Sequence, residues 1–335
     1  MNFLLIRFSS FGDVIITTSL VKLIKKSFPK SKVFFLTHHH NLPLLQGIPE
    51  IDQVFSYQKQ KGSKDFKALK MQLEKIKDVD VVVDLHKNLR SLMVRLLTPG
   101  SFYISVFKRA FLRKMLVKFK INLMIRQPSL HSRLRSDFKF LLNLVDDGQL
   151  PKTLSPLNKS SHAGFHIVMA PGGSFSSKLW GNQRFEALIQ RLLDYDQALK
   201  ISVVAGPDDT FSSSKDFLDC QFHHRFENYK GKLDLLDSMK IVSQADYVIG
   251  NDSLFSHVAE SMGIPCLTLF GSTHPDFGFR PHLENSEFIF KNIGCSPCST
   301  DGKRKCFQKS HLCMEGIKVE EVIEAYSRFR EERVG

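Results

Sequence analysis

The sequence predicts an α/β protein built from two doubly wound domains, each with a parallel sheet. At 335 residues the chain is long enough for about two domains with a core each. Short apolar runs alternate with stretches whose apolar residues recur at helical spacing, which is typical of parallel sheets. A stretch rich in Pro, Ser, Gly and Lys, Asp147 to Gly164, interrupts this alternation and is the best candidate for a linker. We therefore expect domains at 1–155 and 156–335, whose strand ends face a shared central cleft.

The first domain is expected to begin with a strand, because Phe3 to Ile6 is a short apolar run. In the helix that follows, Lys25 and Lys26 lie in the last turn and Pro29 ends the helix. The elements predicted for this half are, in order, a strand at 3–6, a helix at 14–28, strands at 33–36 and 80–85, and a helical, basic region at 101–146.

After the linker the alternation of strands and helices resumes. The elements predicted for this half are, in order, a strand at 166–170, a helix at 184–195, a strand at 200–205, a helix at 232–244, a strand at 247–249, a helix at 254–262, a strand at 266–270 and a helix at 318–333. The last helix is amphipathic. We also consider that it packs back on the N-terminal domain.

The composition is that of a soluble globular protein, with 42% hydrophobic and 24% charged residues. No apolar run approaches the length of a membrane span. The segment Met1 to Arg7 is apolar only briefly and has neither a basic leader nor a small-residue cleavage site. These features indicate a first strand rather than a signal peptide, and we expect a cytoplasmic protein.

The formal net charge of +13 is unevenly distributed. Ser101 to Arg135 contains nine Lys or Arg residues and no Asp or Glu, with aromatic and aliphatic residues interleaved. Such a segment fits an anionic membrane surface or an acidic glycolipid, and equally a helix whose basic face is only solvated. Nucleic acid is less consistent, because no known nucleic-acid-binding module is present. We expect a monomer that binds no nucleic acid.

Four of the six cysteines are clustered near the C-terminus. They are Cys295, Cys298, Cys306 and Cys313. Disulfides are rare in cytoplasmic proteins, so a structural zinc is one interpretation of this cluster. The spacing matches no standard finger or ribbon, and the other interpretation is a cysteine-rich loop that binds nothing. We predict no metal site.

The most informative segment runs from Tyr247 to Pro281. An apolar run predicts a buried strand, a turn follows, and an amphipathic helix comes next. The turn contains three residues that favour the N-cap position, Asn251, Asp252 and Ser253. Unpaired amides and the positive end of a helix dipole would therefore lie at the carboxyl end of a strand, flanked by Asp252 and His257. This arrangement predicts a phosphate or diphosphate site.

Two further loops follow predicted strands. In the first loop Gly12 permits a tight turn, and Asp13 enters the helix at its N-terminus, where the dipole favours the ionised form. Asp13 is therefore either a general base or only a helix cap. The second loop, at 169–180, is rich in Gly and Ser and offers amides and hydroxyls to a phosphate, with Lys178 as a point charge.

With these three loops in this order, the chain resembles the heptosyltransferase family, the inverting glycosyltransferases of lipopolysaccharide core assembly. The segments that carry the resemblance are RFSSFGDVIITTSL at 7–20, DLHKNLRS at 84–91, APGGSFSSKLW at 170–180, VVAGPDD at 203–209 and GNDSLFSHVAESMGIPCLTLFGSTHP at 250–275. They cover essentially the whole chain in the order of the family. Two positions depart from the family, because Lys87 and Leu254 stand where glycine is common.

The resemblance implies the GT-B fold, with two Rossmann-like domains that bind the acceptor (N-terminal) and the nucleotide sugar (C-terminal). It implies no nicotinamide and no essential metal, so that an ADP-sugar is a co-substrate and no cofactor is needed. By motif position it also implies the site residues: Asp13 as the catalytic base; Ser174, Lys178, Asp252, Ser253, Leu254 and His257 at the donor; and Ser10, Gly12, His86, Asn88 and Arg90 at the acceptor.

We therefore expect an inverting glycosyltransferase that transfers a heptose from ADP-heptose to the inner core of lipopolysaccharide, either Kdo-lipid A or a heptosylated core. The acceptor is an acidic glycolipid, and the segment at 101–135 is expected to hold the protein at the inner face of the cytoplasmic membrane. Three alternatives stay open. They are a glycosyltransferase that uses another nucleotide sugar for a surface glycan, a nucleotide-sugar epimerase of the same architecture, and a non-catalytic nucleotide- or glycan-binding homologue.

Overall fold

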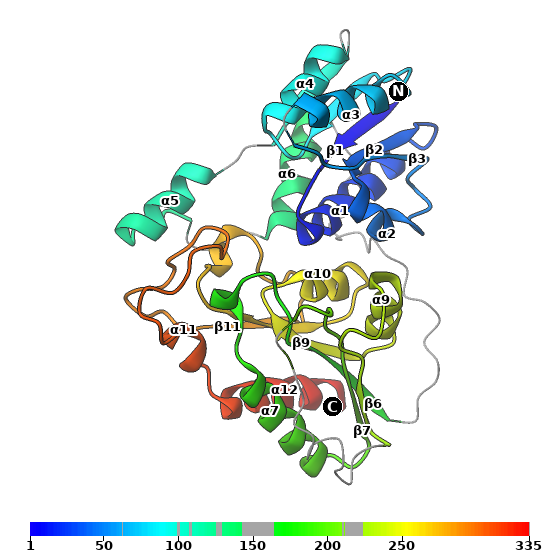
Figure 1. Cartoon of the computed structure of the whole chain (residues 1–335). Coiled ribbons are helices and arrows are strands. Elements are labelled where there is room, and N and C mark those ends of the chain that lie inside the picture. Colours follow the sequence, from blue (N-terminus) through cyan, green and yellow to red (C-terminus); the bar gives the residue numbers. More distant parts are fainter. Residues whose placement is uncertain are drawn as a thin grey trace. The chain divides into compact units, whose positions relative to one another are not determined.

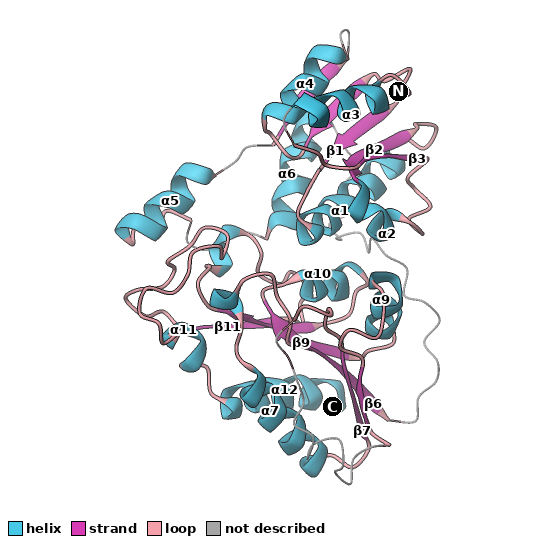
Figure 2. Cartoon of the chain, viewed as in Figure 1, coloured by secondary structure: helices cyan, strands magenta, loops and turns pink. Residues whose placement is uncertain are grey.

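The computed structural model describes residues 1–61, 63–98, 101–106, 109–124, 129–142, 164–209, 211 and 224–334, so the predicted linker up to residue 163 lies outside it. The chain divides into two compact units (Figure 1). The N-terminal unit contains Met1–Arg109 and Leu130–Ser155, and the C-terminal unit contains Ala110–Ser129 and Pro156–Gly335. Each unit has one parallel sheet with helices packed on it (Figure 2), and the predicted α/β class is confirmed.

The N-terminal unit contains a five-stranded sheet in the order β3-β2-β1-β4-β5. The strands are β1 (Phe3–Ile6), β2 (Val33–His38), β3 (Gln53–Tyr57), β4 (Val81–Asp84) and β5 (Phe102–Ser105). The helices are α1 (Phe11–Ser27), α2 (Leu42–Leu45), α3 (Ser63–Leu73), α4 (Leu89–Leu97) and α6 (Leu130–Leu142), with a 3₁₀ turn at His39–Asn41. Every residue of β1 and β4 is buried, because helices cover both faces of the central strands.

The C-terminal unit contains a six-stranded sheet in the order β11-β10-β9-β6-β7-β8. The strands are β6 (Phe165–Ala170), β7 (Leu199–Val203), β8 (Phe226–Asn228), β9 (Tyr247–Asn251), β10 (Cys266–Phe270) and β11 (Glu287–Phe290). The helices are α5 (Ala110–Phe119), α7 (Asn182–Tyr195), α9 (Leu235–Ser243), α10 (Leu254–Ser261), α11 (Leu312–Glu315) and α12 (Val319–Val334), with 3₁₀ turns at Ser176–Lys178 and Pro275–Phe277.

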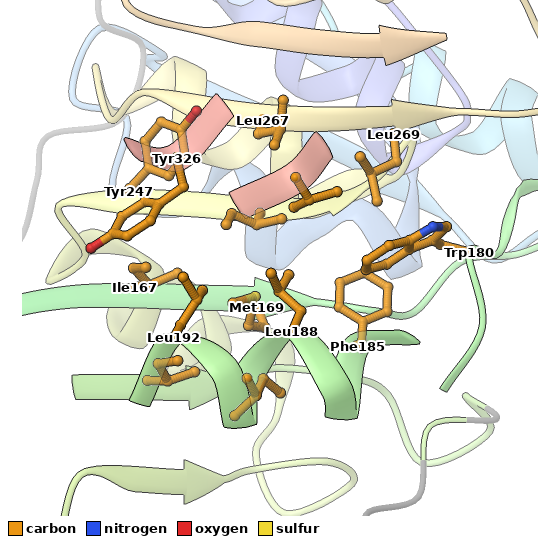
Figure 3. Close-up of a cluster of buried hydrophobic side chains, with 14 of the residues drawn as sticks. Ile167, Met169, Trp180, Phe185, Leu188, Leu192, Tyr247, Leu267, Leu269 and Tyr326 are labelled. Carbon is orange, nitrogen blue, oxygen red and sulfur yellow. The ribbon is translucent and has the colours of Figure 1, made fainter. Parts of the chain in front are cut away.

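One core of the C-terminal unit forms where α7 and α12 pack on the sheet (Figure 3). Trp180 is fully buried there, with its ring edge-on to Phe185 at a centroid distance of 5.0 Å. Its indole Nε1 donates a hydrogen bond to the carbonyl of Ile317 at 2.9 Å, which satisfies its only polar atom. At the other end of the core Tyr247 stacks on Phe329 at 4.1 Å. The only Trp is therefore a core residue that fixes the end of the loop after β6.

Both sheets reverse their strand order beside their first strand. The reversal lies between β1 and β4 in the N-terminal unit and between β6 and β9 in the C-terminal unit. Ligands of doubly wound sheets bind at the carboxyl ends of the strands at such a reversal. The loops and helix starts at these ends contain Asp13, His86, Lys178 and Asp252. The fold thus brings the predicted residues of each unit to the place where a ligand site is expected.

Two predictions for the segment 101–135 are corrected by the structure. Residues 102–105, predicted to be helical, form the edge strand β5. Residues 110–129, assigned to the N-terminal domain, belong to the C-terminal unit. There Leu116 and Met124 pack against Phe277, and Arg113 Nη2 donates to the Phe277 carbonyl at 2.7 Å. The partner of this segment is more than 150 residues away in the chain, so no local pattern could identify it.

The helix α12 contributes one face to the core of the C-terminal unit. Its buried residues there are Val322, Ala325, Tyr326 and Phe329. They recur at helical spacing on one face. That apolar face is therefore occupied within the C-terminal unit, and the packing of α12 on the N-terminal domain stays a prediction.

Replacement of the α12 anchor should destabilise the C-terminal unit. We expect Phe329→Ala to lower the free energy of unfolding by about 3–5 kcal/mol, because it leaves a cavity beside Tyr247. Denaturant unfolding followed by the fluorescence of Trp180, which lies in the same core, measures the effect. The control is Tyr195→Ala, since Tyr195 is 83% exposed and its loss should cost no more than about 0.5 kcal/mol. Equal stability of the two variants would contradict the described packing.

Candidate functional site

Asp13 is held by a guanidinium group and by the start of its own helix. Ser10 is the N-cap residue of α1, and Asp13 lies in the first turn. Asp13 Oδ2 accepts hydrogen bonds from Ser10 Oγ at 2.9 Å and from the Ser10 amide at 3.2 Å. The same oxygen forms an ion pair with Arg7 Nη2 at 2.7 Å. All three contacts fall on Oδ2 and leave Oδ1 outside this network.

The environment of Asp13 favours the carboxylate form. Burial alone would raise the pKa of Asp13, but attraction to Arg7 and hydrogen bonds from Arg7 and Ser10 outweigh it, so the pKa lies below its usual value. The side chain is 17% exposed. Arg7 also donates to the carbonyl of Leu85, just beyond β4. The structure therefore contains the predicted cap, and it also provides the ionised carboxylate that a general base requires.

An aromatic cluster lies at the carboxyl edge of the same sheet. The ring of Phe8 lies 5.3 Å from those of His38 and His86 and 5.8 Å from that of Tyr57, between centroids. Strand pairing places His38 opposite Tyr57. Burial, together with repulsion from neighbouring cations, lowers the pKa of His38 to about 4, so this ring is neutral at pH 7. The sequence did not reveal this cluster, because recognising it requires the order of the strands.

The loop after β4 is organised by a buried carboxylate. Asp84 Oδ1 accepts hydrogen bonds from the amides of His86 at 2.9 Å and Lys87 at 2.7 Å. Lys87 has a φ of 51°, a left-handed conformation that glycine adopts at lower cost. The turn directs His86 toward Phe8 at the strand ends.

Two of the predicted acceptor residues have structural partners of their own. Asn88 caps α4, since its Oδ1 accepts a hydrogen bond from the Ser91 amide at 3.1 Å. Arg90 Nε is paired with Asp65, whose side chain is only 3% exposed. Their described contacts therefore fix the start of α4. The other predicted acceptor residues, Ser10, Gly12 and His86, lie in the loops and helix start at the carboxyl ends of β1 and β4.

In the C-terminal unit, Lys178 and Asp252 form an ion pair across the two central strands. Lys178 Nζ lies 2.7 Å from Asp252 Oδ2, and Thr273 Oγ1 donates to the same oxygen at 2.8 Å. Their side chains are 14% and 3% exposed. Burial would raise the pKa of Asp252, but attraction to Lys178 and hydrogen bonds from Lys178 and Thr273 outweigh it and the pKa is lowered. The side chain of Asp252 is therefore a carboxylate at neutral pH.

The start of α10 lies beside this ion pair. Ser253 is the N-cap residue, and Leu254 is the first residue of the helix. His257, one turn further, is close enough to Asp252 to contribute to its lowered pKa. The structure thus brings together five of the six predicted donor residues, which are Lys178, Asp252, Ser253, Leu254 and His257. The sixth, Ser174, is exposed on the loop after β6.

Two residues that were not predicted as site residues, the buried Asn251 and the half-buried Asp209, hold the loop after β6. Asn251 Oδ1 accepts a hydrogen bond from the Trp180 amide at 3.1 Å, and its Nδ2 donates to the Pro171 carbonyl at 2.6 Å. Asp209 accepts a hydrogen bond from the Gly173 amide at 3.0 Å. A Cβ atom on Gly172 would lie 2.2 Å from Asp209 Oδ2, so a larger residue here would displace this carboxylate. Asn251 and Asp209 are positioning residues for Lys178.

The cysteine-rich loop, Cys295 to Cys313, packs against the side chain of Lys178 through Gly302. Ser177 Oγ donates to the carbonyl of Gly302 at 2.7 Å and lies 2.8 Å from Ser272 Oγ. A Cβ atom on Gly302 would lie 2.5 Å from Cε of Lys178, so the loop backbone packs directly on the lysine side chain. The Ser272 carbonyl in turn accepts a hydrogen bond from the amide of Cys298 at 3.1 Å. The conformation of this loop therefore determines the position of the ammonium group.

The four clustered thiols lie near one another. Burial, with the proximity of the other three cysteines, raises the pKa of Cys313 to about 11, and burial also raises the pKa of Cys298. All four are free cysteines. Within the described part of the chain, no group of three or more His, Cys, Asp or Glu residues is arranged to hold a metal ion. The thiol contacts are therefore consistent with a compact loop, and the zinc interpretation gains no geometric support.

Three comparisons with known proteins agree with this geometry. A family model described as glycosyltransferase family 9 (heptosyltransferase) matches residues 69–307, which include Lys178 and Asp252 but not Asp13. Lipopolysaccharide heptosyltransferase 3 of Escherichia coli K12 is 24% identical over 297 residues, which cover 82% of this chain and 83% of the relative. Lipopolysaccharide heptosyltransferase 1 of Campylobacter coli is 23% identical and covers 96% and 97% of the two chains.

Solved structures share the fold over the full length. The E. coli heptosyltransferase WaaC with ADP has a TM-score of 0.71 at 16% identity and covers 98% of this chain and 100% of its own. The E. coli ADP-heptose lipopolysaccharide heptosyltransferase II has a TM-score of 0.68 at 17% identity, with complete coverage of both chains. These matches confirm the predicted GT-B fold.

The ion pair of Lys178 and Asp252 should make a measurable contribution to stability. We expect Asp252→Asn to lower the free energy of unfolding by about 3 kcal/mol, since a largely buried ammonium loses its partner. A second change, Lys178→Met, should recover part of this loss, which denaturant unfolding of both single variants and the double variant would measure.

The same pair predicts a pH dependence. Because the folded pKa of Asp252 is lowered, its stabilisation is complete above the ordinary carboxyl pKa of about 3.9 and is lost as the pH falls through the folded value. Asp252→Asn should therefore show a shallower acid limb than the parent protein. Strictly additive effects of the two substitutions would argue against a coupled pair.

Proposed function

The chain belongs to glycosyltransferase family 9, the heptosyltransferases, and from this premise we propose that it transfers a heptose from ADP-heptose to the inner core of lipopolysaccharide. The observation that carries the proposal is the Lys178–Asp252 pair at the start of α10. An ammonium group, a helix N-terminus and a Ser- and Gly-rich loop together suit a diphosphate. Two solved structures of one relative with the same fold, the E. coli heptosyltransferase WaaC, are described as complexes with ADP and with ADP-2-deoxy-2-fluoro heptose.

In this proposal Lys178 stabilises the leaving group. Its ammonium has three N–H donors, of which two are directed to Oδ2 and the carbonyl of Asp252, so the third can bind a phosphate oxygen. Charge accumulates on the ADP diphosphate as its bond to the anomeric carbon breaks. A cation and helix amides that are already fixed in position stabilise this charge without reorganisation. Asp252 orients Lys178, while Ser174, Ser253, Leu254 and His257 complete the donor site.

Asp13 acts as the general base of an inverting displacement. The acceptor hydroxyl gives its proton to Asp13 while its oxygen attacks the anomeric carbon, and the bonding electrons of the old glycosidic bond leave with ADP. Contacts from Arg7 and Ser10 orient the carboxylate through Oδ2, and Oδ1 accepts the proton. A base of low pKa is sufficient, because the hydroxyl becomes strongly acidic only as the new bond forms.

The acceptor is an acidic glycolipid, either Kdo-lipid A or a heptosylated core. Ser10, Gly12 and His86 bind it at the carboxyl edge of the N-terminal sheet, while Asn88 and Arg90 position the start of α4. The net charge of +13 supports an anionic partner of this kind. No cofactor or metal takes part in the proposed step, and the protein works as a monomer in the cytoplasm, at the inner face of the cytoplasmic membrane.

Calorimetric titration with ADP, UDP and GDP tests the donor site. We expect selective binding of ADP, and we expect Lys178→Ala to weaken it about tenfold or more, because a hydrogen bond to a charged group is lost. Lys240→Ala is the matched control, since Lys240 is an exposed lysine of the same unit, paired with Asp237 on α9. Preference for UDP or GDP would favour another nucleotide sugar, and no binding would favour a non-catalytic homologue.

The substitution Asp13→Asn should distinguish a role of Asp13 as general base from a role as helix cap only. The amide oxygen can still accept from Ser10, so we expect normal folding and normal ADP binding. The rate of heptose transfer should fall by about 10²–10⁴-fold, since the proton acceptor is lost. Radiolabelled transfer in single-turnover conditions measures this rate.

Arg7→Gln serves as the companion variant. It removes the charge that lowers the pKa of Asp13, so the acid limb of the rate profile should move to higher pH while the parent protein stays flat near neutrality. Full activity of Asp13→Asn would reduce Asp13 to a helix cap.

A further inference from the structure

The helix α4 exposes an apolar stripe instead of burying it. Leu89, Leu92 and Leu96 follow one another at helical spacing and are 68%, 46% and 72% exposed. The opposite face of the helix is buried through Ser91 and Val94. Isolated exposed leucines need no explanation, but three on one short helix form a continuous surface. Two more large apolar side chains are exposed in this region. Leu97 at the end of α4 is 40% exposed, and Phe102 of the strand β5 is 64% exposed.

Positive charge surrounds this stripe. The sequence of α4, LRSLMVRLL, contains two arginines and no acidic residue. The neighbouring helix α3 packs beside α4 (Figure 1) and carries exposed Lys64, Lys67 and Lys70. Lys70 Nζ lies 4.0 Å from Oε1 of Glu74, an exposed carboxylate just beyond the end of α3. Its one acidic residue, Asp65, is buried against Arg90. The surface of the two helices thus combines exposed leucines with cations and has the composition of an interfacial helix.

The charge decides between two occupants of this surface. A second copy of the chain would bind through a two-fold contact, in which the same surface faces itself and lysines face lysines. An anionic bilayer accepts the leucines below its headgroups and attracts the cations. We propose that the outer face of α4, flanked by the lysines of α3, is a docking surface for an anionic phospholipid bilayer.

This location differs from the segment 101–135 that the sequence favoured. Two cations of that segment are used within the C-terminal unit: Arg113 donates to the Phe277 carbonyl, and Lys120 Nζ donates to the carbonyls of Cys295 and Pro297 at 2.9 and 2.7 Å. The helix α4, in contrast, starts directly after the loop that carries His86. If the proposed function holds, one helix links the acceptor sugar site to the membrane in which the acceptor is anchored.

Vesicle flotation tests the proposal with the full chain. The probes are vesicles of phosphatidylethanolamine and phosphatidylglycerol, with phosphatidylcholine vesicles as the neutral comparison. We expect binding to the anionic vesicles that weakens at high salt, and a loss of about tenfold or more for Leu92→Glu/Leu96→Glu, which places charge on two side chains that the bilayer should bury. Both positions are exposed, so thermal unfolding and ADP binding should be unchanged.

Two further variants sharpen the result. Tyr195→Glu introduces the same charge at an 83% exposed apolar position of the C-terminal unit and should bind vesicles normally. Phe111→Glu/Phe119→Glu on α5, where the parent side chains are 69% and 54% exposed, should lose less binding than the α4 variant.

Several outcomes would overturn the proposal. They are an absence of binding by the parent chain, equal binding to neutral vesicles, and a greater loss from the α5 variant. A dimer seen by light scattering that Leu92→Glu/Leu96→Glu dissociates, without vesicle binding, would assign the surface to a second copy. The flotation assay contains no nucleotide, so it fails or succeeds independently of the ADP titration that tests the proposed function.

Discussion

Parallel sheets that are covered on both faces leave no room for charge along their central strands. In the C-terminal sheet β6 and β9 are buried along their whole length. They also lie so close that a Cβ atom on Gly250 would be 2.8 Å from the carbonyl oxygen of Ala170. Polar groups that a ligand can reach are therefore expected where these strands end, and Asn251 and Asp252 lie there. The N-terminal sheet meets the same constraint with Asp84 at the end of β4. The chemistry of each unit is thus confined to one edge by the packing of its core.

Each edge stabilises a carboxylate with one cation and one hydroxyl group. In the N-terminal unit Asp13 has Arg7 and Ser10, and in the C-terminal unit Asp252 has Lys178 and Thr273. The consequences differ because the cations differ. The planar guanidinium holds Asp13 through one oxygen and leaves the other available, so in the proposed function the carboxylate takes the proton. The ammonium has a further donor to offer, so in the proposed function the cation binds the ligand at the second edge.

The sequence predicted those parts of the molecule that depend on local patterns. The buried strand at 3–6 and the strand at 266–270 were placed to the residue, because continuous apolar runs mark central strands. The loop cations and caps, Lys178 and Asp252 among them, were identifiable from their positions after such runs. Other features could not be predicted, because they depend on which strands are neighbours. Two examples are the ring contacts of Phe8 with His38 and Tyr57 and the hydrogen bond from the Gly173 amide to Asp209. They can be predicted only when the order of the strands is known.

Arg7 has one more consequence for how such a protein can change over time. Its guanidinium group contacts Asp13 with one nitrogen and the Leu85 carbonyl with another. The loop that begins at Leu85 carries His86, so a substitution that reshapes this loop for a different acceptor also moves the partner of Asp13. If the proposed function holds, selectivity for the acceptor and the basicity of the carboxylate are inherited together. A lineage that acquires a new acceptor through this loop must then retune its base in the same step or lose rate.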